Sequence, residues 1–158
     1  MPDPSTMPPP NMEAVLRFYA TSPHHQAIGL KVVSADREKA VMRVGYDKRF
    51  IGNPDTGALH GGLVTTLMDS TGALAVLAQV PAGTAVATLD LRLDYLRPAI
   101  PGQDLIGDSH CFKVTPNLAF SRGTAFEEGN DDDPVANFVA TYMLKPVGIG
   151  MDTGGDAS

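Results

Sequence analysis

Apolar and polar side chains alternate between residues 85 and 96, and this two-residue period predicts a β-strand. Three further strands are expected at residues 104–115, 118–128 and 135–145, separated by short segments rich in Pro, Gly, Asn and Asp. Connections of hairpin length join antiparallel neighbours. The second half of the chain therefore predicts an antiparallel sheet.

The first half of the chain predicts short helices and two more strands. In chain order we expect two helices, two strands and a loop, at residues 12–20, 23–28, 30–35, 39–47 and 48–59. Asn11 is a suitable N-cap for the first helix, and Gly29 is suited to ending the second. The loop is assigned because its residues are rich in Gly, Pro, Asn and Asp.

Residues 61–80 form the longest apolar segment, which Pro81 and Gly83 close. Its apolar residues run nearly all round a helix, so other elements should enclose it. A curved antiparallel sheet wrapped around this one central helix is the simplest arrangement, and it makes the fold class α+β. We expect a single domain at residues 11–146, between a disordered Pro-rich arm (1–10) and a flexible Gly-rich tail (147–158).

Composition narrows the possible functions. The chain has 158 residues and a net charge of −6, which argues against a nucleic-acid binder and against charge-driven membrane binding. Its one cysteine, Cys111, excludes an internal disulfide framework, and its four histidines lack the spacing of metal ligands. The N-terminus has neither a basic region nor an apolar run, and no segment suits a membrane span, so we expect a cytoplasmic protein.

Asp69 is the one ionisable side chain between residues 61 and 83. A carboxylate within an apolar helix costs several kcal/mol unless it is paired or hydrogen-bonded. Either it serves a site, or it bonds a local hydroxyl such as that of Thr65 or reaches solvent through a gap.

Gly61 and Gly62 stand where this helix should begin. Free N–H groups at a helix start can bind an anion or a developing oxyanion, although a Gly-Gly pair is also compatible with a simple tight turn. Asp69 follows Gly61 by eight residues, roughly 12 Å along a helix. If both act in one site, two chains must contribute to it, which predicts a two-fold dimer with two sites at its interface.

Several of these residues carry a family resemblance. His60-Gly61-Gly62, Asp69, Thr88 and the strand end Tyr95-Leu96-Arg97-Pro98 resemble the hotdog-fold acyl-CoA thioesterases, most closely the PaaI-like (phenylacetate-pathway) branch of the 4-hydroxybenzoyl-CoA thioesterase superfamily. The resemblance covers about residues 25–145. It implies a hotdog fold, and hydrolysis of an acyl-CoA thioester to free acid and thiol.

The resemblance also implies roles for individual residues. Gly61 N–H would bind the thioester carbonyl, the partner chain's Asp69 would act as general base or nucleophile, and the Thr88 hydroxyl would place water. His60 would lie beside the oxyanion, Gly62 would contact substrate, and Arg97 would meet the phosphates of coenzyme A. Asn53 resembles a loop asparagine that polarises the carbonyl, displaced by one position.

Four of these residues also have a structural alternative. His60 could stabilise the loop, and Thr88 could be an ordinary strand residue. Asn53 could be a turn residue, and Arg97 a solvated charge. Coenzyme A would be part of the substrate, with no separate cofactor and no metal. The assembly implied is a homodimer at least, commonly a homotetramer built from two dimers.

Two other functions remain open at this point. A hotdog-fold hydratase or dehydratase would use a histidine and an acid as a proton-shuttling pair. A non-catalytic acyl-CoA sensor would share the fold but would have no need of Asp69 at the thioester. Lone Cys111 is expected to pack in a strand rather than to act as a nucleophile.

Much of the negative charge lies in one hairpin and in the terminal segments. Five acidic residues crowd one hairpin and three lie in the terminal segments, at Glu127, Glu128, Asp131, Asp132 and Asp133, and at Asp3, Asp152 and Asp156. Setting those eight aside leaves ten acidic residues against twelve basic ones. Because surface potentials are screened over about 8 Å, an anionic thioester remains a plausible ligand.

Overall fold

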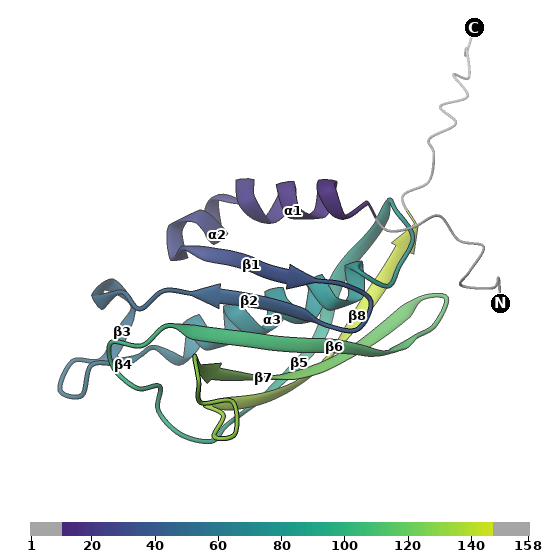
Figure 1. Cartoon of the computed structure of the whole chain (residues 1–158). Coiled ribbons are helices and arrows are strands. Elements are labelled where there is room, and N and C mark those ends of the chain that lie inside the picture. The colour runs from purple at the N-terminus through teal and green to yellow at the C-terminus, as the bar shows by residue number, and fades with distance from the viewer. Residues whose placement is uncertain (1–10, 147–158) are drawn as a thin grey trace, which may run out of the picture.

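The computed structural model describes residues 11–146, in which six antiparallel strands form one curved sheet (Figure 1). The strand order is β1-β2-β6-β7-β8-β5. Their bounds are Leu30–Ala35 (β1), Ala40–Val44 (β2), Thr84–Tyr95 (β5), Leu105–Val114 (β6), Leu118–Glu127 (β7) and Ala136–Pro146 (β8). Each predicted strand is confirmed, although β2 ends at Val44 rather than at residue 47.

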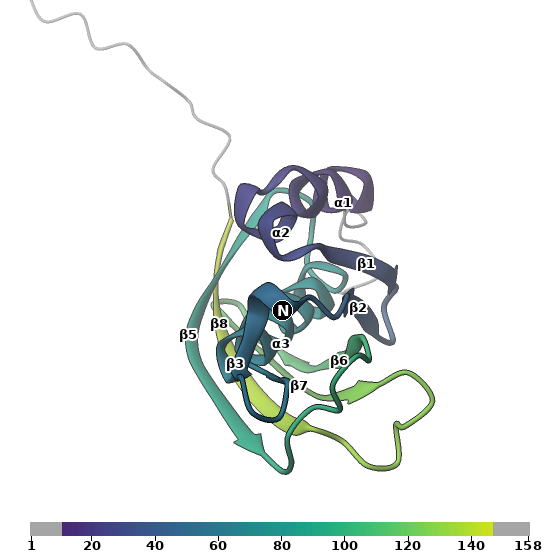
Figure 2. The same cartoon turned by 90° about the vertical axis from the view of Figure 1, so that its left-hand side faces the viewer.

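The long helix α3 (Gly61–Leu77) lies inside the curve of the sheet, as Figure 2 shows along the helix. Its side chains Leu67 and Leu74 are fully buried against the concave face. Gly72 lets the helix approach β8, because a Cβ there would overlap the hydroxyl of Tyr142. The predicted α+β architecture is confirmed, with α3 ending at Leu77 rather than at residue 80.

Helices α1 (Met12–Thr21) and α2 (Pro23–Ile28) cover α3 on the side that the sheet leaves open (Figure 2). As predicted, Asn11 caps α1, and Gly29 ends α2 with a positive φ of 68°. Tyr19, on the buried side of α1, donates a hydrogen bond from its hydroxyl to the Ser70 carbonyl at 3.0 Å. This contact ties the N-terminal helices to the middle of α3.

The expected loop at residues 48–59 contains regular structure, so that prediction was wrong. A 3₁₀ turn, η2 (Lys48–Phe50), leads into a two-stranded hairpin of β3 (Ile51–Asn53) and β4 (Ala58–Leu59). Gly52 allows this hairpin to lie against the start of α3, because a Cβ there would stand 2.7 Å from the His60 Cα. The His60 N–H donates to the Phe50 carbonyl at 2.8 Å. The hairpin thus fixes the place where α3 begins.

Other elements cover α3 on most sides, as predicted, and this single chain leaves one face of the helix partly open. Gly62 is exposed, and Thr66, Asp69 and Ala73 on the same face of the helix are only partly buried. We call these four residues the open stripe of α3. It runs at helical spacing, and β5 on the same chain is an edge strand of the sheet.

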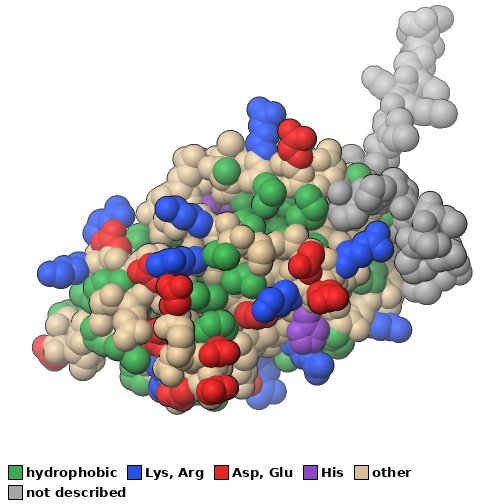
Figure 3. Space-filling view, in the orientation of Figure 1, with side chains coloured by type: hydrophobic (Ala, Val, Ile, Leu, Met, Phe, Trp, Pro, Cys, Tyr) green, Lys and Arg blue, Asp and Glu red, His purple; other side chains and the backbone are tan. Residues whose placement is uncertain are grey.

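The outer surface carries charges of both signs. On the face seen in Figure 1, Lys and Arg side chains are interspersed with Asp and Glu around scattered apolar side chains (Figure 3). Within residues 11–146, no helix has the length and apolar character to cross a membrane. The expected arm at residues 1–10 and tail at residues 147–158 lie outside the described residues.

Candidate active site

His60 organises the start of α3 as its N-cap. Its ring Nδ1 accepts a hydrogen bond from the Gly62 N–H at 2.9 Å, and its carbonyl accepts from the Leu63 N–H at 2.9 Å. Across residues 11–146, no acceptor is bonded to the Gly61 N–H. Of the two glycines, Gly61 therefore presents the free donor, and the Gly62 N–H is already used inside the chain.

Tyr95, at the end of β5, holds the other side of the first helical turn. Its hydroxyl donates to the Gly61 carbonyl at 2.7 Å and lies 2.8 Å from the Thr65 hydroxyl. A Cβ on Gly61 would stand 3.2 Å from this hydroxyl, so the packing suits glycine. Sequence reasoning used Tyr95 only as part of a strand-end motif and missed this contact, because the alternating pattern grouped it with leucines.

Asp69 is hydrogen-bonded to Thr88, the residue to which the family resemblance gave a related role. The Thr88 hydroxyl donates to Asp69 Oδ1 at 2.8 Å, from the point where a bulge interrupts β5. Within the described part of the chain no donor is bonded to Oδ2. Thr65 bonds Gly61 and Tyr95 instead, so the alternative of a Thr65–Asp69 contact was wrong. The carboxylate is held at one oxygen and open at the other.

The structure thus contains two half-sites on α3. The first is the free Gly61 N–H with His60 and Tyr95, and the second is Asp69 with Thr88. They stand eight residues apart on one helix, roughly 12 Å at 1.5 Å per residue. Because a helix is rigid over this distance, one chain does not bring the two halves onto a single carbonyl.

Asn53 occupies the β3–β4 turn. Its side-chain oxygen accepts from the Asp55 N–H at 3.0 Å, and its carbonyl accepts from the Gly57 N–H at 2.8 Å. The side chain is exposed, and no hydrogen bond joins it to Gly61 in the described chain. The geometry is that of a turn residue, the alternative that the displaced position already suggested.

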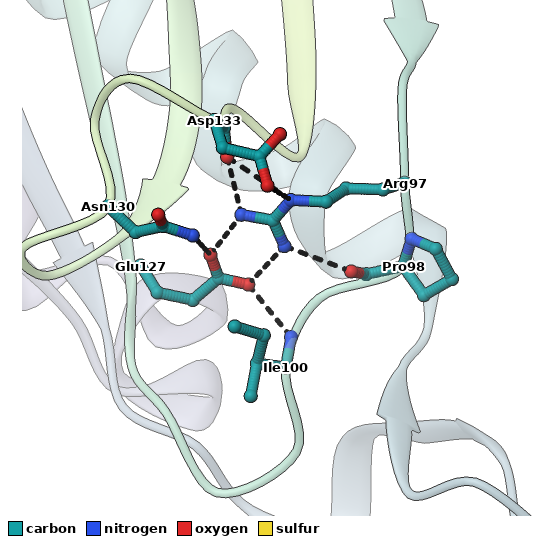
Figure 4. Close-up of polar contacts among 6 residues, drawn as sticks. All are labelled: Arg97, Pro98, Ile100, Glu127, Asn130 and Asp133. Carbon is teal, nitrogen blue, oxygen red and sulfur yellow. Dashed lines mark hydrogen bonds and ion pairs between the residues drawn. The ribbon is translucent and has the colours of Figure 1, made fainter.

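Arg97 lies in a closed polar cluster rather than at the surface (Figure 4). Its guanidinium binds both carboxylate oxygens of Glu127, at 2.9 and 2.5 Å, and its Nε lies 2.9 Å from an Asp133 carboxylate oxygen. The Arg97 side chain is only 20% exposed. The expected contact with coenzyme A phosphates stays a prediction, and in this chain the guanidinium is already bound by the carboxylates of Glu127 and Asp133.

Glu127 lies in the acidic hairpin where the sequence placed it, but it differs from its acidic neighbours in burial. Its side chain is fully buried, and its carboxylate also accepts from the Ile100 N–H at 2.8 Å. Burial alone would raise the pKa of Glu127, but the hydrogen bonds from Arg97 and Ile100 outweigh it and lower the pKa from 4.5 to about 2. A charged pair at positions 97 and 127 leaves no periodic signal, so the sequence could not reveal it.

Two hollows flank the start of α3. One, of about 380 Å³, lies beside Gly61 and is mostly apolar; its lining is Leu59, Gly61, Val64, Tyr95, Leu96, Arg97, Pro98, Ala99 and Val135. The other, of similar size, lies beside His60 and Gly62 and extends past Arg49. Within residues 11–146, no three His, Cys, Asp or Glu side chains gather as a metal site would require.

Comparison with known proteins relates the chain to thioesterases. Residues 56–132 match the family model of the thioesterase superfamily. Mouse acyl-coenzyme A thioesterase 13 is 28% identical over 113 residues, which are 70% of this chain and 79% of that protein. Some curated relatives match over less of their length, and the chain spans 58% of a Halobacterium salinarum relative at 38% identity over 90 residues.

Solved structures extend the likeness over most of the fold. A crystal structure of a Pseudomonas aeruginosa protein is 40% identical, with a TM-score of 0.74, and the alignment covers 83% of this chain and 96% of that one. A variant of the phenylacetic acid degradation protein PaaI from Thermus thermophilus is 28% identical, with a TM-score of 0.66, and the alignment covers 77% and 98% of the two chains.

Proposed function

Because the chain belongs to the thioesterase superfamily, we propose that it hydrolyses the thioester bond of an acyl-coenzyme A to a free acid and a thiol. The observation that carries the proposal is the pair of half-sites on α3. A free N–H at a helix start suits a developing oxyanion, and a carboxylate with one open oxygen suits activation of water.

In this mechanism the Gly61 N–H and the positive end of the α3 dipole stabilise negative charge on the thioester oxygen. Asp69 accepts a proton from water as the water oxygen bonds to the carbonyl carbon. As a nucleophile it would instead bond to that carbon and form a mixed anhydride, which water would hydrolyse to the free acid and Asp69 once the thiolate has left. The C–S bond then breaks, and the thiolate leaves and takes up a proton. Thr88 holds Asp69 Oδ1, so that Oδ2 faces the reacting group.

We further propose that each site joins Gly61 of one chain to Asp69 of a second. The open stripe of α3 supports this, because its small residues Gly62, Thr66 and Ala73 leave room for an antiparallel partner helix beside Asp69. The edge strand β5, which carries Thr88, lies next to this stripe. Two chains related by a two-fold axis would thus complete two identical sites.

The competing roles are less well supported by the same contacts. A hydratase or dehydratase would use an imidazole that shuttles a proton together with an acid, whereas the His60 ring holds the helix start by accepting from the Gly62 N–H at Nδ1. A sensor would bind an acyl-CoA without releasing a thiol. Measuring thiol release separates that role from hydrolysis.

Asp69→Asn tests the proposal, because it keeps the shape of the side chain and removes its basicity. We expect kcat for acyl-CoA hydrolysis to fall by about 10²–10⁴-fold, measured as thiol released over time. Asp131→Asn, at an exposed position, is the matched control and should keep full activity. Undiminished turnover by folded Asp69→Asn protein would refute the assignment.

A further inference from the structure

The hollow beside Gly61 has a buried apolar floor. Leu59, Val64, Ala99 and Val135 each expose less than a tenth of their surface, at 8%, 1%, 4% and 1%. Tyr95 and Leu96 form the rim and are 52% and 53% exposed. The volume of about 380 Å³ lies within the range of small-molecule sites. We call this space the apolar hollow.

The apolar hollow presents no free charge. Arg97 is the one charged residue in its lining, and its guanidinium is bound bidentately by Glu127 and again by Asp133 (Figure 4). Two carboxylates against one guanidinium leave no unpaired positive charge for a ligand. A ligand group entering this space meets aliphatic side chains and would lose its hydration without gaining an ionic partner.

The opposite side of the helix start has a different character. The groove beside His60 and Gly62 runs past Arg49 and Phe50. There it adjoins a second groove that is lined by Lys31, Arg43 and Arg49 together with Asp47 and Asp104. The two grooves share Ile28, Arg49 and Phe50, so they follow one another along the surface. Arg43 and Arg49 pair with Asp104 and Asp47, but Lys31 forms no ion pair in the described part of the chain. This side therefore offers a cationic group that the apolar hollow does not.

We propose that the apolar hollow binds the acyl group of the substrate and selects an uncharged, apolar acyl group. This inference rests on the proposed hydrolysis, because it takes the thioester carbonyl to lie at the Gly61 N–H. A carbonyl held there has the acyl carbon on one side and the sulfur on the other. The acyl group enters the hollow next to Gly61 and Tyr95, and the anionic coenzyme A portion follows the polar groove past His60 and Arg49.

The first test compares four coenzyme A thioesters with the full-length protein: acetyl, hexanoyl, phenylacetyl and succinyl. We expect kcat/KM for the hexanoyl or phenylacetyl thioester to exceed that for the succinyl thioester by at least about tenfold, because the succinyl carboxylate finds no partner in the hollow. Comparing the hexanoyl with the phenylacetyl thioester shows whether a linear or an aromatic acyl group fits better. Equal or better hydrolysis of the succinyl thioester would overturn the proposal.

The second test narrows the apolar hollow. Leu96→Trp, at an exposed rim position, and Ala99→Leu, on the floor, should each lower the hexanoyl-to-acetyl ratio of kcat/KM by about tenfold or more. Ala14→Leu on exposed α1 is the matched control and should leave the ratio unchanged. Because Leu96 is half exposed, its variant keeps the test valid if Ala99→Leu fails to fold. A ratio unchanged in folded Leu96→Trp protein would refute the assignment.

A binding measurement separates failure of this inference from failure of the proposed function. Hexyl-coenzyme A, a thioether that is not hydrolysed, should bind wild-type protein at least about tenfold more tightly than coenzyme A itself, and Leu96→Trp should remove that difference. Hydrolysis without this preference would leave the thioesterase proposal standing and refute the acyl hollow. Preferential binding of hexyl-coenzyme A without hydrolysis of any of the four thioesters would support the apolar hollow as the acyl site and refute the proposed hydrolysis.

Discussion

At the scale of single residues, the two adjacent glycines differ in what their N–H groups do. Gly62 N–H is bonded to His60 Nδ1, and Gly61 N–H is free within the described chain. The sequence identified the Gly-Gly pair and its distance from Asp69, since both depend only on position. The family resemblance assigned the donor role to Gly61, but residue positions alone could not distinguish the two donors, because that difference follows from the orientation of the His60 ring.

Gly61→Pro and Gly61→Ala isolate the free donor. Gly61 is the first residue of α3, where proline is well tolerated, and His60 already has the extended backbone, φ −64° and ψ 134°, that a following proline requires. We expect Gly61→Pro, which lacks the N–H, to lower kcat by about 10²–10³-fold relative to Gly61→Ala.

The alanine variant is the control for added bulk, since both variants place a Cβ near the Tyr95 hydroxyl and only one loses the donor. Steady-state kinetics of the two proteins, with circular dichroism to confirm folding, provide the comparison. Equal kcat values for the proline and alanine variants would show that the Gly61 N–H has no part in catalysis.

The pairing of Asp69 with Thr88 was predictable only in part. The sequence placed one residue in a helix and the other in a strand, and the family resemblance gave them related roles. Their contact at 2.8 Å depends on how α3 crosses β5, which neither residue encodes alone. Tyr95 shows the same limit, because its hydrogen bond to Gly61 comes from the same helix–strand packing.

At the scale of elements, one cluster joins two connections of the sheet. Arg97, just after β5, binds Glu127 at the end of β7 and Asp133 before β8. Glu127 also binds the Ile100 N–H, which fixes the segment between β5 and β6 (Figure 4). This cluster therefore holds Pro98 and Ala99, which line the apolar hollow, in place.

Glu127→Gln should lower the free energy of unfolding by about 3–5 kcal/mol, because it leaves Arg97 without its bidentate partner in a mostly buried position. The lowered pKa of Glu127 also gives a pH dependence. A carboxylate whose pKa is lower in the folded state adds stability that is complete above its unfolded pKa and is lost as pH falls through the folded value.

For Glu127 that loss spans the interval from about pH 4.5 down to about pH 2. Urea denaturation at pH 7 and through this interval measures it, and the difference between wild type and Glu127→Gln should shrink as pH falls. Glu128→Gln is the matched control at a 69% exposed side chain, with an expected change of at most about 1 kcal/mol. If both variants unfold alike at pH 7, the cluster does not stabilise the fold.

Regular elements differed in how well the sequence predicted them. Strands β5 to β8 are ten to twelve residues long, so their alternating pattern is readable. Strands β3 and β4 have three and two residues, too few for any period, and were expected as a loop. Their pairing depends instead on the close approach of Gly52 to His60, a tertiary contact.

At the scale of the whole molecule, the sheet around one helix followed from the sequence, but the open stripe of α3 did not. The apolar composition of α3 predicted burial on most sides, and it did not show which face one chain leaves open, namely Gly62, Thr66, Asp69 and Ala73. In the dimer that we propose, a second chain lies against this stripe. It would also supply the Asp69 that the first chain's Gly61 lacks.

Our central claim, that one site is built from two chains, is tested most directly by mixing defective chains. A heterodimer of Gly61→Pro and Asp69→Asn chains, co-expressed with two affinity tags and purified through both, would contain one site with both groups intact. We predict that it hydrolyses an acyl-CoA at about half the wild-type rate per dimer, while each variant homodimer remains nearly inactive. Activity no higher than that of the two homodimers would contradict the shared site.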